Sequence, residues 1–400
     1  MRLAYTLAAA LAAPQASLAA NPVDWPSVLS EAQGQTVYWN AWGGSEATNA
    51  FIGWVGDRVE ADYGVSLVHV KLSDTADAVS RVLAERAAGI DEGGAIDLIW
   101  INGANFAAMK SEGLLFGPFA ENLPNWAFVD GEGKTVTTDF TVPTDGYESP
   151  WAMAQVVFMR DTADLPDAPG SAAEILDWAT AHPGRFTYPQ PPDFLGTTFL
   201  KQMLVDLTND ALALAAAPES DAAYEAVTAP LWAYLDALTP HLWRSGRAYP
   251  ATGPAQLQLI YDNEIDLAIS FSPGEATAAI SNGLLPDTVR TSVLAKGTIG
   301  NASFLAIPYN ANAAAGAMVV ADFLLSSEAQ LRAQDPAILG YGTVLDMAKL
   351  PDADRADFGA LDLGIATLSP AELGTAQPEP HPDWMTRIAA DWQHRYGAGL

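Results

Sequence analysis

The sequence predicts an α/β protein with two domains, the first of which is interrupted by the second. Three strand-then-helix patterns follow one another from Thr36, which is typical of a doubly wound sheet. A second series of such patterns begins near Ser149. A strand at 297–308 then leads the chain back to the first domain, and the helices after it resemble those of the first half. The chain has 400 residues, 50% of them hydrophobic, which is enough for two cores of ordinary size.

The strands of the first series can be followed in order along the chain. TVYWNAW precedes a helix whose apolar residues Phe51, Ile52, Val55 and Val59 fall on one face. VSLVHVKL and IDLIWIN each precede another helical pattern. IDLIWIN, at 96–102, is almost continuously apolar, as expected for a strand that is buried on both faces of a parallel sheet.

The second series begins with ESPWAMAQVVFMRD, which predicts one long strand. This strand, near Ser149–Met159, and a returning strand near Ile299–Ile307 are the two strand-like hinge crossovers that we expect between the domains. The first lobe is then discontinuous, at 21–150 and 304–400, and the second lobe spans 151–303.

Two helices of the second lobe carry start signals. Ser171 and Glu174 have the Ser-x-x-Glu spacing of a capping box. In DLAISFSPGEATAAI, Ser272 is expected as the N-cap, with Pro273 at the first helical position and Glu275 at the third.

The first 20 residues have the features of a secretory signal peptide. Arg2 gives the positive start, Leu3–Ala13 an apolar stretch, and Ser17-Leu18-Ala19 a small-residue cleavage site. This stretch is too short to cross a bilayer, and no later segment reaches about 18 continuous apolar residues. We therefore expect an exported mature protein in the periplasm.

The charge of the chain is strongly acidic. Lys and Arg number 19 against 48 Asp and Glu, a net charge of −29. A field of this sign repels phosphate backbones, so we expect no nucleic acid partner. Most of the charge serves solubility, and the remainder favours cationic ligands. The chain has no Cys, so it has no disulfide and no Cys-ligated metal.

The common catalytic signatures fail in this sequence. Gly133-Lys134-Thr135 ends like a phosphate loop, but Phe128 stands where that motif needs a glycine. Gly43–Ala47 lacks the spacing of a nucleophile elbow, and the His residues form no metal-binding pair. We expect no enzyme, no cofactor and no metal site. A secreted hydrolase acting through two carboxylates and a structural envelope protein remain as alternatives.

Four loops that follow strands are rich in Gly, Asn, Ser and Thr, and ligands of open α/β sheets bind at such loops. In the first loop Gly43 and Gly44 let a ligand approach the main chain, while Ser45 caps the next helix. The alternative to ligand binding at that loop is a tight turn followed by a helix cap, and the residues do not distinguish the two. The four loops are Trp42–Ser45, Asn102–Asn105, Pro189–Thr198 and Ser270–Gly274.

Aromatic and acidic residues near these loops extend the site. Trp42, Trp151 and Trp243 adjoin loops or a hinge, where stacking on a ligand and packing are equal alternatives. Glu148 and Asp193 have no obvious local role, which favours contact with a ligand cation. The candidate ligand-binding residues are Trp42, Gly43, Gly44, Ser45, Asn102, Asn105, Glu148, Trp151, Asp193, Gly196, Thr197, Thr198, Trp243, Ser272 and Asn301.

Several blocks of the sequence carry a family resemblance in a common order. They include YWNAWGGSEATNAFIGWV, DLIWINGANF, LPNWAFVD, YPQPPDFLGTTFLKQML and GTIGNASFLAIPYNANAAAGAMVVADFLLSSEAQL. From Ala32 to Pro351 the chain resembles the YnjB-type periplasmic solute-binding components of ABC importers. The resemblance implies a type II binding fold, in which two α/β lobes close on a small-molecule ligand in the cleft between them. It also implies a monomer that delivers the ligand to the membrane permease of the importer.

The resemblance leaves the ligand open. Ferric sites of related proteins present neighbouring tyrosines, and no loop here has a Tyr-Tyr pair. The expected helix N-termini at Ser45, Thr197 and Ser272 suit an oxyanion, whereas the net charge, Asp193 and Glu148 favour a cation. We expect a thiamine-like compound or another organic cation, with a sugar or a free oxyanion as the alternatives.

Overall fold

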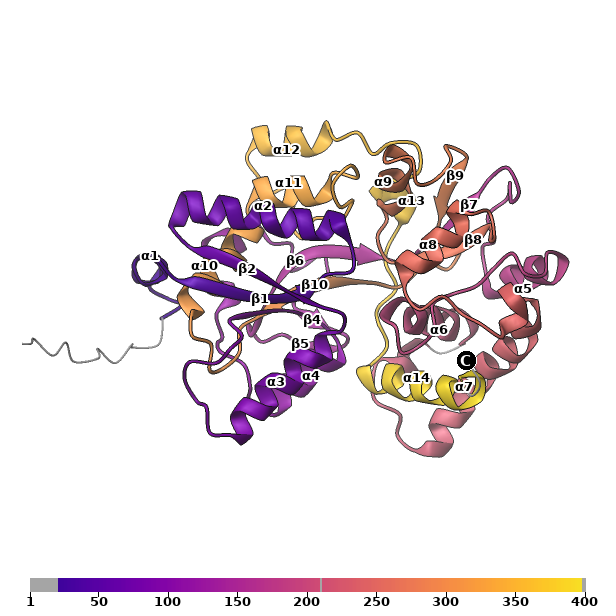
Figure 1. Ribbon diagram of the computed structural model, residues 1–400, viewed down its shortest axis with the longest axis horizontal. Helices are drawn as coiled ribbons and strands as arrows, with labels where there is room; N and C mark the ends of the chain where they lie inside the picture. The colour runs from indigo at the N-terminus through magenta and orange to yellow at the C-terminus, as the bar shows by residue number, and fades with distance from the viewer. Residues whose placement is uncertain (1–20, 209–210, 398–400) are drawn as a thin grey trace, which may run out of the picture.

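A computed structural model describes residues 21–208 and 211–397 of the chain. The expected signal peptide, residues 1–20, lies outside the described residues. The chain forms two lobes that lie side by side, each built around its own main sheet (Figure 1).

The first lobe contains a five-stranded sheet in the order β2-β1-β3-β10-β6. The central strand β1 pairs in parallel with β2 and β3, while β10 runs antiparallel to both β3 and β6. Its strands are β1 (Thr36–Trp42), β2 (Ser66–Leu72), β3 (Leu98–Ile101), β6 (Glu148–Gln155) and β10 (Gly300–Ala306). A two-stranded hairpin, β4 (Thr138–Asp139) and β5 (Val142–Pro143), lies outside this sheet.

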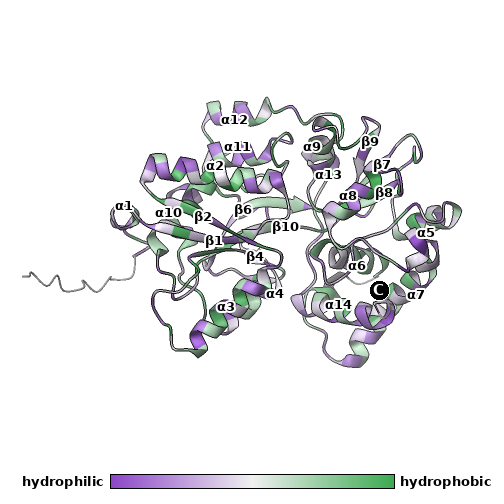
Figure 2. Cartoon of the chain, in the orientation of Figure 1, coloured by the Kyte–Doolittle hydropathy of each residue, from purple (hydrophilic) through white to green (hydrophobic). Residues whose placement is uncertain are grey.

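The helices α2 and α3 pack against strands of this sheet, and Figure 2 shows hydrophilic and hydrophobic residues alternating along both. In α2 the buried residues include Phe51, Ile52, Val55 and Val59, which confirms the predicted apolar face. The helices are α1 (Trp25–Ala32), α2 (Glu46–Tyr63), α3 (Thr75–Ala87), α4 (Ala104–Ser111), α10 (Ala314–Leu324), α11 (Ser327–Gln334) and α12 (Asp352–Gly359), with the 3-10 turns η1 (Ala120–Asn122) and η2 (Pro124–Phe128).

The second lobe has a three-stranded antiparallel sheet in the order β8-β7-β9. Its strands are β7 (Val157–Asp161), β8 (Leu267–Ser270) and β9 (Val289–Ser292). Its helices are α5 (Ala172–Ala181), α6 (Phe194–Leu207), α7 (Asp221–Leu238), α8 (Gly253–Tyr261), α9 (Glu275–Ser281), α13 (Pro370–Leu373) and α14 (Pro382–Tyr396), with the 3-10 turns η3 (Ala211–Leu214), η4 (Thr239–His241) and η5 (Trp243–Gly246).

The single long strand predicted from ESPWAMAQVVFMRD is divided at Val156. Its first part is β6 of the first sheet and its second part is β7 of the second sheet, so the chain changes lobes between Gln155 and Val157. Val156 N donates to Ile299 O (2.8 Å), and the chain returns to the first sheet just after Ile299 as β10. The two expected crossovers therefore lie next to each other.

The C-terminal part of the chain crosses once more. Phe358 is buried in the core of the first lobe, whereas Ala366 is buried with residues of the second. In α14, Trp384 and Trp392 belong to the second-lobe core, and Trp392 Nε1 donates to the hydroxyl of Tyr188 (2.9 Å). This helix was expected in the first lobe, but it lies beside α6 of the second lobe (Figure 1).

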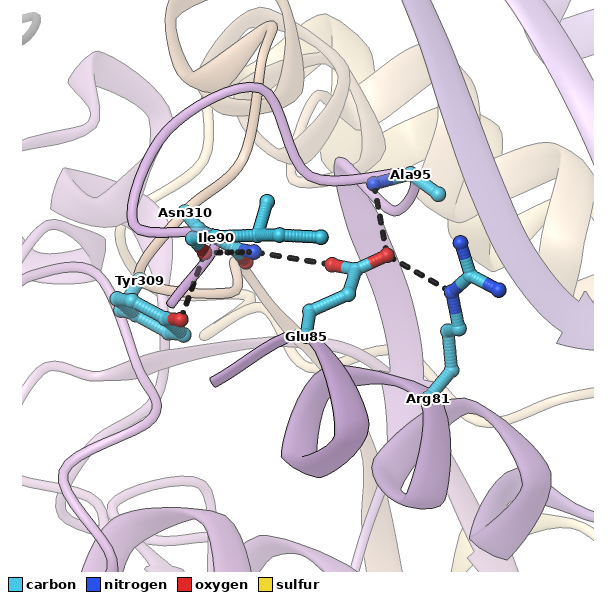
Figure 3. Close-up of polar contacts among 6 residues, drawn as sticks. All are labelled: Arg81, Glu85, Ile90, Ala95, Tyr309 and Asn310. Carbon is cyan, nitrogen blue, oxygen red and sulfur yellow. Dashed lines mark hydrogen bonds and ion pairs between the residues drawn. The ribbon is translucent and has the colours of Figure 1, made fainter. Parts of the chain in front are cut away.

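A buried carboxylate ties the α3–β3 connection to the returning chain in the first lobe (Figure 3). Glu85 accepts hydrogen bonds from Arg81 Nε (2.8 Å), Asn310 Nδ2 (2.9 Å) and Ala95 N (3.3 Å). Asn310 Nδ2 also donates to Ile90 O (3.0 Å). Burial raises the pKa of Glu85, but the bonds from Arg81, Asn310 and Ala95 outweigh burial and hold the pKa below its ordinary value of 4.5.

We expect Glu85→Ala to lower the free energy of unfolding by about 1–3 kcal/mol at pH 7, because the buried amide of Asn310 and two further donors lose a charged acceptor. A lowered pKa contributes stability above the ordinary value of 4.5, and this contribution is lost as pH falls below it. The difference from the wild type should therefore shrink at about pH 3.5. Urea unfolding at both pH values measures it, with the exposed Glu60→Ala as the control. Equal stabilities at pH 7 would contradict this role.

Candidate ligand-binding cleft

The loop between β1 and α2 presents two glycines at the edge of the first lobe. Gly43 N donates to Leu72 O (3.0 Å), which joins the ends of β1 and β2. A Cβ on Gly44 would overlap the indole of Trp42, so the ring lies against the glycine backbone. Ser45 Oγ accepts from Thr48 N (3.4 Å), which confirms Ser45 as the N-cap of α2.

The loop between β3 and α4 is fixed by the β4–β5 hairpin. Gly103 has a φ of +60°, and its N–H donates to Asp139 Oδ2 (2.6 Å). A Cβ on Gly103 would lie 2.9 Å from the Phe140 ring, so this position needs glycine for its conformation and for its close approach. Asn102 and Asn105 flank this glycine and are both half-buried.

Asp193 has a local role that the sequence analysis missed, because it is the N-cap of α6. Its Oδ1 accepts from Leu195 N (2.9 Å) and Gly196 N (3.1 Å). Burial raises the pKa of Asp193, these two amides lower it, and the charge of Asp74 raises it again. Asp74 is the N-cap of α3 in the first lobe, so the charge of an acidic cap on one lobe acts on an acidic cap of the other.

The first turn of α6 contains three further candidate residues. A Cβ on Gly196 would overlap Pro189 O, so this glycine is required by close packing. Thr198 Oγ1 donates to Phe194 O (2.8 Å) within the helix. Thr197 Oγ1 is buried and has no hydrogen-bond partner among residues 21–208 and 211–397.

The loop after β8 reaches from the second lobe to the first. Ser272 Oγ donates to Leu339 O (3.2 Å). The expected N-cap at Ser272 is wrong, because α9 begins at Glu275 with Gly274 as its N-cap. The hydroxyl of Ser270 explains the difference, since it donates to Glu275 Oε2 and accepts from Ser272 N (3.0 Å), forming a turn before the helix.

Two glycines bring the backbones of the lobes into contact. A Cβ on Gly274 would overlap the Cα of Gly340, and the reverse is also true. Beside this contact, burial raises the pKa of Tyr341 to about 12, a hydrogen bond with Thr48 lowers it, and the charge of Glu275 raises it. Tyr341 therefore contacts the first turn of α2 and senses the charge at the start of α9.

A buried ion pair joins the second lobe to the C-terminal chain. Lys201 is fully buried, and its Nζ lies 2.7 Å from Glu379 Oε2. Asn301 Nδ2 donates to Glu379 Oε1 (2.9 Å), so the candidate Asn301 lies in this cluster. Burial lowers the pKa of Lys201 and raises that of Glu379, and the attraction between them opposes both shifts. The sequence analysis missed this pair.

Two acidic residues of the first lobe are buried. Asp139 is 1% exposed, and burial raises its pKa to about 8, against the bond from Gly103. Glu148 is fully buried, and neither carboxyl oxygen has a hydrogen-bond partner in the described part of the chain. Burial, followed by the charge of Asp139, raises the pKa of Glu148 well above its ordinary value. Burial and the nearby charge of Asp139 therefore both disfavour the charged form of Glu148 inside the lobe.

Two of the three candidate tryptophans are engaged by other side chains. Trp151 is fully buried. The centroid of its ring lies 4.9 Å from that of the Trp100 ring and 6.0 Å from that of the Phe51 ring. Its role is packing in the first-lobe core. Trp243 Nε1 donates to Glu264 Oε2 (2.7 Å), and the guanidinium of Arg244 lies 4.1 Å from its ring.

The family follows from sequence comparison together with these two lobes and their interlobe loops. The sequence profile of a family described as bacterial extracellular solute-binding protein matches residues 54–358. This chain is a bacterial extracellular solute-binding protein. The binding protein is 44% identical over 381 residues to Protein YnjB of Escherichia coli (strain K12), a match that covers 95% of this chain and 96% of that protein.

Solved structures of periplasmic and ABC-transporter binding proteins share the fold. The protein AfuA from Actinobacillus pleuropneumoniae, with fructose-6-phosphate bound, aligns with a TM-score of 0.61 at 14% identity over 91% of this chain and 99% of that one. A putative spermidine/putrescine ABC transporter from Listeria monocytogenes aligns with a TM-score of 0.61 at 17% identity. This alignment covers 90% of this chain and 98% of that one. Apo ferric ion-binding protein A from Pasteurella haemolytica aligns with a TM-score of 0.63 at 12% identity, over 91% of this chain and 98% of that one. The expected type II fold is confirmed.

Membership of the family places the binding protein outside the cytoplasm and assigns it solute binding in place of catalysis. The hydrolase and envelope-protein alternatives are therefore set aside. Within residues 21–208 and 211–397, no helix is long and apolar enough to cross a membrane. The same part of the chain contains no cluster of three or more His, Cys, Asp or Glu side chains that could hold a metal ion.

We expect Asp139→Asn to flatten the pH dependence of stability. A raised pKa contributes stability that is present below the ordinary value of 3.8 and is lost as pH rises toward about 8. The wild type should lose at most about 1.4 kcal/mol per pH unit through this group, while Asn cannot ionise and still accepts from Gly103. Thermal unfolding from pH 6 to 9 measures the difference, with the exposed Asp57→Asn as control. Parallel curves would show that Asp139 does not titrate in this range.

Proposed function

We propose that the chain is the periplasmic receptor of an ABC importer and that its solute is a small organic cation. The observation that carries the proposal is the pair of acidic helix caps, Asp74 on the first lobe and Asp193 on the second, each within the electrostatic range of the other. Two like charges that act on each other from opposite lobes oppose closure unless a cation lies between them.

The geometry of the caps leaves acceptors for such a ligand. Asp74 uses Oδ1 for the amide of Ala76 (2.8 Å), and Asp193 uses Oδ1 for two amides of α6. The Oδ2 atoms remain for a charged ligand group, which gives stronger hydrogen bonds than a neutral group. The net charge of −29 also raises the concentration of cations near the protein.

Ring-bearing cations, with thiamine and its phosphates first, suit this cleft best. Trp42 is half-buried beside the glycine loop and offers an aromatic surface at the edge of the first lobe. The N-termini of α2, at Ser45, and of α6, near Thr197, can bind a polar or phosphorylated end of the same molecule. Glu148 and Trp151 take no part in this proposal, because both are enclosed in the first lobe.

A receptor for a sugar phosphate or a free oxyanion is the alternative. The unpartnered hydroxyl of Thr197 and the two helix N-termini favour it. A structural relative with fructose-6-phosphate bound and another described as a spermidine/putrescine transporter share this fold, so the fold accommodates either ligand class.

In either case we propose that the lobes rotate about the adjacent crossovers, close on the solute and present it to the permease as a monomer. Small-angle scattering of the protein with and without a bound solute measures this motion. We expect a smaller radius of gyration in the bound form, whereas an unchanged radius at saturation would indicate a rigid cleft.

A thermal-shift screen tests the ligand class with thiamine, its phosphates, spermidine, fructose 6-phosphate and neutral sugars. A ligand present at 100 times its dissociation constant stabilises the folded form by about 2.7 kcal/mol. We expect stabilisation by the ring-bearing cations. Stabilisation only by neutral sugars or by anions would reject the cation and support the alternative.

For a cation that stabilises the protein, Asp193→Asn and Asp74→Asn should each weaken binding by about 1.5–3 kcal/mol, or roughly 10- to 150-fold in Kd. Asn is as good an N-cap as Asp, so both variants should fold normally. Asp24→Asn is the matched control, because Asp24 caps α1 by the same type of bond at an exposed position. Isothermal titration measures all three variants, and equal affinities would exclude the two caps from the site.

A further inference from the structure

The β4–β5 hairpin has a turn of unusual conformation. Phe140 and Thr141 connect its strands with φ values of +43° and +73°. A two-residue turn with both φ angles positive favours Asn and Gly, and a β-branched residue such as Thr is an outlier there. Residues held in this way occur where surrounding contacts fix them, often at ligand clamps and switches.

Contacts from both lobes fix this turn. Phe140 is 3% exposed, and the Nζ of Lys201 from α6 of the second lobe lies 4.4 Å from the centre of its ring. On the other side the ring lies against Gly103 in the loop between β3 and α4. The hairpin of the first lobe therefore inserts an aromatic ring between its own cleft loop and a buried ammonium of the second lobe.

The ammonium is held in place from behind by the C-terminal chain. Lys201 pairs with Glu379, which also accepts from Asn301 at the start of β10. Thr141 and Glu379 line the same small cavity, with a volume of about 40 Å³. Thr141 Oγ1 is buried and has no hydrogen-bond partner among the described residues. Within the part of the chain that the structure describes, the turn therefore has an unpaired hydroxyl at Thr141 in addition to the positive φ angles of both of its residues.

We propose that Phe140 and Thr141 form a latch that positions the two lobes in the closed state. The inference rests on the proposed function only in assuming that the lobes open and close. When they separate, the ring leaves Lys201 and the turn is free to relax. The ring contact therefore favours closure, and the strained turn opposes it.

The latch also connects closure to the cleft. Asp139, next to the turn, accepts from the amide of Gly103, which lies between the candidate residues Asn102 and Asn105. A displaced hairpin pulls on this loop, so opening and the shape of the ligand site change together. Phe140 is in this sense a positioning residue that acts on the ligand through the β3–α4 loop.

The test measures the distance between the lobes in the ligand-free protein. Because the chain has no Cys, Glu60→Cys on α2 and Asp177→Cys on α5, both exposed, give one labelling site on each lobe for single-molecule energy transfer. Phe140→Ala removes the latch ring. Phe194→Ala is the matched control, since that ring also faces Lys201 (5.4 Å) but belongs to the same helix of the same lobe.

We expect Phe140→Ala to raise the ratio of open to closed molecules by about 3- to 30-fold, the range of one desolvated cation–π contact. Phe194→Ala should leave the ratio unchanged. Gly274→Ala provides the reference for opened lobes, because its Cβ would overlap the backbone of Gly340. Circular dichroism verifies that each variant is folded.

Thr141→Gly distinguishes the latch from a general role of the hairpin in folding. Glycine adopts a positive φ without strain, so this variant should shift the ratio toward closed molecules, opposite to Phe140→Ala. A shift to open molecules in both variants, or no shift in either, would overturn the latch. No ligand enters the measurement, so failure of the proposed cation would leave this result intact.

Discussion

The backbone hydrogen bond from Val156 N to Ile299 O joins the two strands that pass between the lobes. Gln202 from α6 accepts from Ile299 N (2.8 Å), and Gln377 of the C-terminal chain pairs with the same residue in a parallel bridge. Each sheet has its own hydrophobic core, so rotation between lobes costs least where the few connecting segments are held together. In the proposed rotation, the position of these connecting segments decides which loops meet.

The buried charges of the protein differ from the exposed charge at a helix cap. Lys201 and Glu379 are buried as a pair, and Asp139 and Glu148 have raised pKa values because burial disfavours their charged forms. Asp74, in contrast, keeps an exposed carboxylate at the start of its helix. The buried charges are thus paired or have their charged forms disfavoured, whereas the exposed carboxylate of Asp74 is one of the two caps that we propose for the ligand.

Local patterns predicted the parts of this fold that local physics determines. The apolar faces of α2 and the cap at Ser45 depend on residues a few positions apart, and both are confirmed. The division at Val156 could not be read from the sequence, because Gln155, Val156 and Val157 include no Gly, Pro or other turn residue that would mark a break in the strand. The pair of Lys201 and Glu379 is separated by 178 residues, and only the tertiary fold brings it together.

Asp193 shows why the site was harder to predict than the fold. A carboxylate without a visible local partner suggested a ligand contact, yet its Oδ1 caps α6. The two roles are compatible, because a cap occupies one oxygen and fixes the direction of the other. A rigid cap on each lobe presents a carboxylate in a defined place at no further cost in side-chain entropy. The helix start that hid Asp193 in the sequence therefore also fixes the carboxylate that we propose as a ligand contact.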